Sequence, residues 1–308
     1  MRKRISRPKI ERLSDQPTPS HHKTSFQKPK KFIKRPNNDP FAQKIEQTVS
    51  GFVPPKDHHA DTEEIRLNKY ISNAGVCSRR QADDYIKEGY VTVNGETILE
   101  MGYKVQAKDD VRFKGKKVEN ERKVYILMNK PKGLLTTTAD EHNRKTVMDL
   151  VSTVKNARIY PVGRLDRNTT GVLIMTNDGE LAQKLSHPSG NITKVYQVEL
   201  NIPLKPEDLL KIKKGVQLED GLAEVDEIDY TLPRGDDRHV GVELHSGKNR
   251  IVRRIFEELG YEVVKLDRVL YGGLTKKNLP RGKWRFLTDK EIIFLKYFVG
   301  NSKPKKQA

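Results

Sequence analysis

The first regular pattern of apolar and polar positions along the chain predicts two short helices followed by strands. Apolar residues recur at helical spacing over 67–74, and a glycine ends that helix. Ser78 and Gln81 have the spacing of a capping box, so a second helix is expected to begin there. Asn94-Gly95 favours a hairpin turn between two short strands. The pattern therefore predicts a compact helix–turn–helix unit packed on a few strands.

Farther along the chain, short apolar runs separated by turn residues predict a larger domain that is rich in strands. The clearest runs span residues 124–128, 172–176, 195–200 and 240–244. One helix is expected to begin at Pro206, and its first turn contains two acids. Another helix is expected over 250–259, where apolar residues form one face. Because strands outnumber helices and several are joined by short turns, we expect an α+β fold with a mixed, largely antiparallel sheet.

These patterns divide the chain into four parts. Residues 63–122 form the small N-terminal domain, 123–300 the larger domain, and 301–308 a short basic tail. Residues 1–62 are rich in Pro, Ser, Lys and Arg and carry 14 Lys or Arg against 6 Asp or Glu. Such a segment cannot bury enough apolar surface to fold, so we expect a disordered basic tail that keeps the protein in solution or adheres to RNA.

Composition narrows the class of protein. The net charge of +18 attracts polyanions, of which nucleic acids are the first candidates. No apolar run is long enough to span a bilayer, so no membrane is expected and a cytoplasmic location is favoured. The single cysteine, Cys77, excludes an intramolecular disulfide, and the sequence has no zinc-type ligand spacing. The tail histidines, His21-His22 and His58-His59, are expected to be solvated rather than to hold a metal.

Arg79 and Arg80 begin the second predicted helix, where the helix dipole disfavours cations. A bound phosphate would reverse this penalty, because free N–H groups, dipole and guanidinium all attract it. The alternative is pairing with Asp83 and Asp84 one turn later, which would stabilise the helix only slightly. We expect these two arginines to bind RNA.

The late helix carries a similar basic stripe of Arg250, Arg253 and Arg254. Phosphate binding would again explain cations at a helix N-terminus. Glu257 and Glu258 lie four residues beyond Arg253 and Arg254, so pairing with acids within the helix explains the stripe equally well. The sequence leaves both interpretations open.

A glycine-bracketed loop over 163–171 contains the most unusual charge pattern in the chain. Asp166 lies between Arg164 and Arg167, and close cations favour the ionised form of a carboxylate. Such a group can act as a nucleophile, as a base or only as a salt-bridge partner. The residues alone favour the salt bridge.

Several segments resemble the ribosomal-RNA branch of the pseudouridine synthases, the RsuA-like family. They are NKPKG at 129–133, GRLDRNTTGVLIMTNDGEL at 163–181, KVYQVEL at 194–200, GVQLEDG at 215–221, and GKNRIVRRIFEELGYEVVKLDRV at 247–269. Residues 66–95 are similar to the RNA-binding domain of the ribosomal small-subunit protein S-four. The resemblance covers about residues 66–290 and is strongest to the large-subunit type B.

The resemblance implies an enzyme that isomerises a uridine of ribosomal RNA to pseudouridine. Asp166 would be the catalytic aspartate, Tyr196 would lie near the target base, and Arg253 would pair with Asp166. An ordinary core residue is the alternative for Tyr196. The expected RNA-binding residues are Arg79, Arg80, Lys130, Lys132, Arg164, Arg167, Arg250 and Arg254.

The implied reaction breaks the bond between N1 and the ribose and remakes it at C5, so atoms are neither gained nor lost. No cofactor is therefore expected, and the chain has no phosphate-binding loop and no dinucleotide fingerprint. The expected partner is ribosomal RNA, in its large subunit or an assembly intermediate, and the enzyme is expected to be monomeric. The competing hypothesis is a non-catalytic RNA-binding protein, which would have no need of the loop around Asp166.

Overall fold

The computed structural model describes residues 40–54, 64–106, 108–155, 157–231 and 236–299. Of the expected N-terminal tail, residues 1–39 and 55–62 lie outside these ranges, and with them both histidine pairs. The expected basic tail over 301–308 lies outside them too. No helix within the described ranges is long and apolar enough to cross a membrane.

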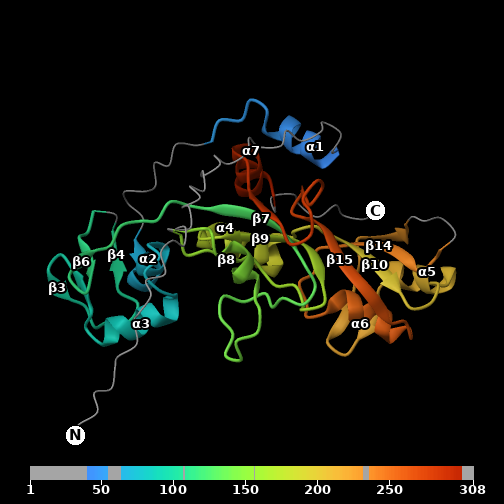
Figure 1. The fold of residues 1–308 in the computed structure, drawn as a ribbon, viewed down its shortest axis with the longest axis horizontal. Coiled ribbons are helices and arrows are strands. Elements are labelled where there is room, and N and C mark those ends of the chain that lie inside the picture. Colours follow the sequence, from blue (N-terminus) through green and yellow to red (C-terminus); the bar gives the residue numbers. More distant parts are fainter. Residues whose placement is uncertain (1–39, 55–63, 107, 156, 232–235, 300–308) are drawn as a thin grey trace, which may run out of the picture. The chain divides into compact units, whose positions relative to one another are not determined.

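The small domain has the predicted arrangement of two helices on short strands (Figure 1). Its elements are β1 (Ile65–Arg66), α2 (Leu67–Asn73), α3 (Arg79–Lys87), β2 (Val91–Val93), β3 (Glu96–Thr97), β4 (Lys104–Val105), β5 (Val111–Phe113) and β6 (Lys116–Lys117). Helix α3 begins with the predicted capping box, in which Ser78 Oγ accepts a hydrogen bond from the backbone N–H of Gln81. Leu67, Ile71 and Ile86 are buried in the core between the helices and the sheet.

The larger domain is built on a sheet that has nine strands within the described ranges. Its strands are β7 (Tyr125–Lys130), β8 (Tyr160–Pro161), β9 (Thr170–Thr176), β10 (Lys194–Leu200), β13 (Glu227–Tyr230), β14 (His239–Leu244), β15 (Val263–Tyr271), β16 (Leu274–Thr275) and β17 (Trp284–Phe286). The main order is β13-β14-β10-β15-β9-β7-β17, while β8 pairs with β9 and β16 with β15. Every pairing is antiparallel except that of β9 with β15, so the predicted fold class is confirmed.

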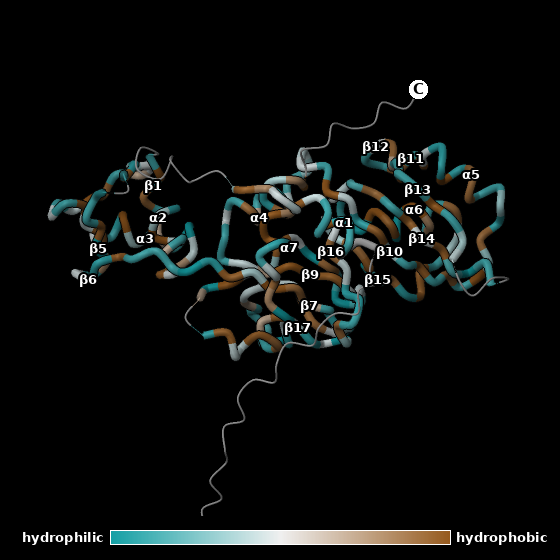
Figure 2. The backbone as a smooth tube through the Cα atoms, turned by 90° about the horizontal axis from the view of Figure 1, so that it is seen from above, coloured by the Kyte–Doolittle hydropathy of each residue, from teal (hydrophilic) through white to brown (hydrophobic). Residues whose placement is uncertain are grey.

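Helices and one hairpin complete this domain. They are η1 (Val147–Val151), α4 (Gly179–Ser186), η2 (Pro188–Gly190), α5 (Pro206–Lys214), α6 (Ile251–Glu258), α7 (Asp289–Ile293), the π-helical turn η3 (Phe294–Phe298), and the hairpin of β11 (Val216–Leu218) and β12 (Gly221–Ala223). Helices α5 and α6 lie with the half of the sheet formed by β10, β13, β14 and β15 (Figure 1). The hydrophobic runs of β7 and β9 form the centre of the other half (Figure 2).

The two halves of the sheet meet at the short parallel pairing of β9 with β15. Only two residue pairs form it, Thr170 with Asp267 and Gly171 with Arg268. The half around β10 has its own buried core, and β7 and β9 bury separate clusters on their two faces. The segment that precedes β9 therefore lies where two independently packed halves come together.

Helix α1 (Pro40–Val49) corrects the expectation of disorder through residue 62. Ile45 and Val49 are buried in one of the clusters around β7 and β9. The ring of Phe52 lies 5.2 Å from that of Tyr297 and 4.9 Å from that of Phe298. The few apolar residues of α1 lie in a charged, proline-rich stretch, so no helix was predicted there. They are buried against apolar residues from the last part of the larger domain.

We expect Ile45→Ala to lower the free energy of unfolding by about 2–4 kcal/mol, because it removes buried methyl groups and leaves a cavity. The matched control is Glu46→Gln on the same helix, which breaks the exposed ion pair of Glu46 with Lys290. That change should leave stability nearly unchanged. Chemical denaturation of the full-length variants measures both effects. Equal effects would show that α1 contributes little through its apolar face.

Candidate active site

The loop that contains Asp166 ends at a glycine that the fold requires. Gly171 has a φ of +110°, and a Cβ there would lie 2.1 Å from the backbone oxygen of Arg268. Any other residue would push β9 away from β15 and break their parallel pairing. The second glycine of the bracketed loop thus sets how closely the loop approaches β15.

Lys130 holds this loop from within the protein. Its side chain is fully buried, and its ammonium group donates to the backbone oxygens of Pro131, Asp166 and Thr169 at 3.0–3.1 Å. Burial lowers the pKa of Lys130 to about 8, and the charge of Asp166 opposes this shift. The prediction that Lys130 contacts RNA is wrong, because its donors are directed at carbonyl oxygens and no surface of it is exposed.

A second set of hydrogen bonds fixes the other side of the loop. The hydroxyl of Thr136 donates to the backbone oxygen of Leu165 at 2.7 Å and accepts from the N–H of Leu165 at 3.3 Å. The N–H of Gly133 donates to the backbone oxygen of Arg167 at 2.8 Å. Thr136 was not among the residues predicted from the sequence, because it stands in a run of three threonines with no distinctive spacing. Together with Lys130, these contacts fix the backbone on both sides of Asp166.

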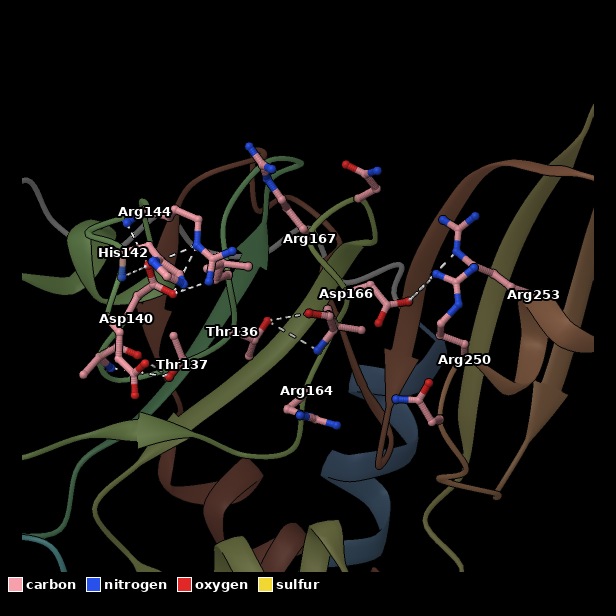
Figure 3. Close-up of a pocket in the computed structure, with 16 residues that line it drawn as sticks. Thr136, Thr137, Asp140, His142, Arg144, Arg164, Asp166, Arg167, Arg250 and Arg253 are labelled. Carbon is pink, nitrogen blue, oxygen red and sulfur yellow. Dashed lines mark hydrogen bonds and ion pairs between the residues drawn. The ribbon is translucent and has the colours of Figure 1, made fainter. Parts of the chain in front are cut away.

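The carboxylate of Asp166 faces two arginines of the segment that begins α6 (Figure 3). Arg253 Nε and Arg250 Nη1 each lie 4.0 Å from Asp166 Oδ2. The Arg253 side chain is 11% exposed, and its Nη1 donates to the backbone oxygen of Val263 at 2.7 Å. Its buried Nε has no hydrogen-bond partner among the described residues. The structure therefore brings together the predicted pair of Asp166 and Arg253.

Burial and the neighbouring charge of Arg250 lower the pKa of Arg253, while Asp166 opposes both effects. Arg250 itself has a left-handed backbone with a φ of +48°, which costs a residue with a side chain about 1 kcal/mol or more. Its guanidinium also pairs with Glu257 at 3.2 Å. This strained residue turns the chain into α6 and keeps a second cation beside Asp166.

Within the described ranges, Arg254 pairs with neither Glu257 nor Glu258, the two acids that the sequence offered as partners. Its guanidinium donates to both carboxylate oxygens of Asp220, at 3.1 and 2.5 Å, from the turn between β11 and β12. Neither Arg253 nor Arg254 pairs with the glutamate four residues beyond it, among the contacts of the described residues. Pairing with acids thus accounts for Arg254, and an RNA contact by this residue would have to compete with Asp220.

A wide cleft of about 760 Å³ lies in front of Asp166. It is lined by the segment from Leu135 to Arg144, the loop that contains Asp166 and the start of α6 (Figure 3). Arg164 and Arg167 are exposed in this cleft, and their contact with RNA stays a prediction. Asp140 accepts hydrogen bonds from Arg144, which lower the pKa of Asp140 and close the turn at the tip of the segment. The pairing of Asp140 with Arg144 was not predicted from the sequence.

A second, smaller space of about 150 Å³, the inner pocket, adjoins Asp166, which lines both spaces. Its floor comes from β10 and β15, which contribute Lys194, Tyr196, Arg268 and Tyr271. Tyr196 is partly buried and pairs across the two strands with Arg268. The structure therefore places Tyr196 in the same pocket as Asp166, where a base could reach both.

The remaining predicted residues lie at the surface. Lys132 is exposed beside the buried Lys130. Arg79 and Arg80 are exposed at the start of α3, and neither forms an ion pair within the described ranges. Asp83, the acid considered for Arg79, accepts a hydrogen bond from Asn68 at 2.8 Å instead. Among the described residues, no group of three His, Cys, Asp or Glu side chains is placed to hold a metal ion.

Comparison with known families identifies two matches in this chain. Residues 124–258 match the family described as RNA pseudouridylate synthase. Residues 65–111 match the S4 domain. The two matches occupy the larger and the small domain, respectively.

Individual relatives extend these matches over most of the chain. Ribosomal large subunit pseudouridine synthase B of Bacillus subtilis is 41% identical over 247 residues, covering 77% of this chain and 98% of that protein. Dual-specificity RNA pseudouridine synthase RluF of Escherichia coli K12 is 36% identical over 251 residues, covering 79% and 84%. A crystal structure of a pseudouridylate synthase aligns with a TM-score of 0.54 at 27% identity, covering 75% of this chain and 99% of that one.

We expect Lys130→Met to lower the free energy of unfolding by about 2–4 kcal/mol, because it leaves buried carbonyl oxygens without a donor. Lys132→Met, two residues away but exposed, is the matched control and should leave stability nearly unchanged. Denaturant titration of the two variants tests this difference. A Lys130→Met protein as stable as Lys132→Met would contradict the structural role of the buried ammonium group.

Proposed function

The chain belongs to the RNA pseudouridine synthase family, and on that premise we propose that it isomerises a uridine of ribosomal RNA, with Asp166 as the catalytic carboxylate. The observation that carries the proposal is the position of this side chain. Asp166 stands between a wide cation-lined cleft and a narrow inner pocket, with Arg250 and Arg253 each 4.0 Å away. A binding module would need the cleft but not the inner pocket.

The geometry suits a reaction at the ribose carbon C1′. The bond from N1 to C1′ must break, and C5 must then bond to C1′. An aspartate can attack C1′ to form an ester, or remove a ribose proton to give a glycal, and both routes need the carboxylate beside the ribose. Lys130 and Thr136 fix the backbone around Asp166, and Arg253 orients its carboxylate. Such fixed positioning is a major source of rate enhancement.

The two spaces around Asp166 suit a nucleotide that has been flipped out of its RNA helix. Unstacking costs a few kcal/mol, which contacts to the flanking phosphates can offset. Exposed Arg164, Arg167 and Arg250 line the cleft where those phosphates would lie. Tyr196 lines the inner pocket, where it would stack on the base or assist proton transfer from C5.

We further propose large-subunit ribosomal RNA as the substrate, free or within an assembly intermediate. The name of the Bacillus subtilis relative supports this choice. The S4 domain, with Arg79 and Arg80 exposed at the start of α3 and Lys132 exposed in the larger domain, would supply further phosphate contacts. We propose that the enzyme acts as a monomer in the cytoplasm, where its charge of +18 would attract the RNA.

Asp166→Asn should abolish pseudouridine formation while leaving RNA affinity and thermal stability unchanged, because the amide is nearly isosteric but cannot perform the chemistry. The matched control is Asp229→Asn on β13, an exposed position on the edge strand of the sheet. The measurement is pseudouridine in ribosomal RNA fragments after incubation with each protein. Activity of Asp166→Asn within tenfold of wild type would overturn the assignment and favour a role in RNA binding alone.

Arg253→Ala should reduce turnover about 100-fold, since a misplaced catalytic group can cost that much. Arg254→Ala should stay within about tenfold, because Arg254 pairs with Asp220 rather than with Asp166. Single-turnover rates at saturating RNA separate this effect from binding. Equal losses in rate and in affinity for the two variants would instead indicate a shared phosphate contact.

A further inference from the structure

Arg268 on β15 is buried in the inner pocket with one part of its guanidinium unused. The residue is 3% exposed, and its Nε donates to the backbone oxygen of Val172 at 2.9 Å. Its buried Nη2 has no hydrogen-bond partner among the described residues. The guanidinium carbon lies 4.2 Å from the centre of the Tyr271 ring, which fixes its plane. A buried donor without a partner costs about 1–3 kcal/mol and therefore requires an explanation.

A second cation lies beside it without a carboxylate partner. The ammonium group of Lys194 donates to the backbone oxygens of His245 and Ser246, at 2.6 and 3.2 Å. Burial and the charge of Arg268 lower the pKa of Lys194 to about 8, and Asp226 opposes the shift from a distance. Neither cation forms a salt bridge within the described part of the chain. Two adjacent cations without a salt-bridge partner, one buried and one partly buried, are costly for the protein to hold, and an anion would relieve that cost.

The register of the sheet directs this charge toward the substrate pocket. Tyr196 on β10 pairs with Arg268 on β15, and Lys194 pairs with Tyr271. Residues directly opposite each other in an antiparallel pair project to the same face. All four side chains line the pocket of about 150 Å³ that Asp166 also lines. Arg268, whose Nη2 has no partner among the described residues, therefore lines the same pocket as the predicted base-stacking tyrosine.

Two anionic groups of an RNA substrate could neutralise this charge, a backbone phosphate or the base itself after it has left the ribose. Phosphates remain in the strand, and the cleft already offers them exposed arginines such as Arg164 and Arg167. The inner pocket, of about 150 Å³ against about 760 Å³ for the cleft, is lined by Tyr196, which is expected to lie near the base, so the group that enters it is the base. The position of Arg268 therefore favours the detached base over a phosphate.

We propose that Arg268 donates its free N–H to a carbonyl oxygen of uracil and stabilises the negative charge of the base while it is detached from the ribose. This inference rests on the proposed isomerase function and names a further residue for it. The electron pair of the N1–C1′ bond moves onto uracil, where it spreads over N1 and the carbonyl oxygens. The charge is lost again when C5 bonds to C1′, the C5 proton leaves, and a proton binds N1.

The test compares uridine with 5-fluorouridine at the target position of the same ribosomal RNA fragment. Fluorine withdraws electrons, so the negative charge of the detached base is more stable when the base carries fluorine. The reaction of 5-fluorouridine should therefore depend less on stabilisation by Arg268. Arg268→Met should lower the single-turnover rate on uridine about 100-fold, the loss typical of one removed anion-stabilising donor. On 5-fluorouridine the loss should shrink to less than about tenfold, with RNA affinity within about twofold of wild type. Consumption of the labelled nucleoside measures both rates.

Other outcomes would overturn the proposal. Equal losses on the two substrates would assign Arg268 a structural role only. Weaker RNA binding, with the slope of log affinity against log salt reduced by about 0.7, would indicate a phosphate contact instead. Arg268→Lys keeps the charge and most of the packing, and it provides the second variant if Arg268→Met does not fold. Its smaller loss on uridine, about tenfold, should likewise shrink on 5-fluorouridine.

A control variant separates this inference from the proposed function. Arg285→Met on β17 removes a guanidinium that pairs with Glu291, outside the residues that line either space around Asp166. Its rates on the two substrates should keep the wild-type ratio. Wild-type protein that converts no uridine in ribosomal RNA would contradict the proposed function itself. Active wild type with an equally active Arg268→Met would overturn only the role of Arg268.

Discussion

The close approach of β9 to β15 is the constraint on which the site depends. These strands pair over two residues only, and one of those pairs is possible because Gly171 has no Cβ to meet the backbone of Arg268. The pairing joins two halves of the sheet that bury separate cores. It also fixes the position of Gly171, where the loop that carries Asp166 ends. On the other strand it fixes the position of Arg268, which lines the inner pocket. One backbone contact thus positions the carboxylate from one half relative to the cations from the other.

The site holds several cations near one carboxylate, and the protein stabilises them mainly with carbonyl oxygens. Lys130 and Lys194 donate to backbone carbonyls, and Arg253 and Arg268 each donate to one. A carbonyl oxygen satisfies a donor without cancelling its full charge, whereas a carboxylate would neutralise it. The positive potential around Asp166 therefore stays available to an anionic substrate. Arg254 shows the contrast, because Asp220 neutralises it outside the pocket.

Local features were predictable from the sequence, and features that depend on register were not. The capping box of Ser78 and the apolar face of α6 follow from spacing within one element, and both are confirmed. The burial of Lys130 was missed because its acceptors are backbone oxygens, which leave no mark on the sequence. Tyr196 and Arg268 pair from strands that are far apart in the chain. The register of this pairing shifts just before Tyr196, and the sequence does not show such a shift. Helix α1 was missed because its few apolar residues depend on a distant surface for their burial.

The depth of each arginine decides what its charge can do. An exposed guanidinium such as Arg250, whose side chain is 45% exposed, acts through water and salt, which weaken its attraction for a phosphate. Arg268, at 3% exposure, is shielded from both, so the same charge interacts more strongly with a group that enters its pocket. Weak contacts suit a long RNA that must bind and leave, since many of them can add up. A strong contact suits a charge that exists only while the base is detached, because it then stabilises that state more than the bound substrate.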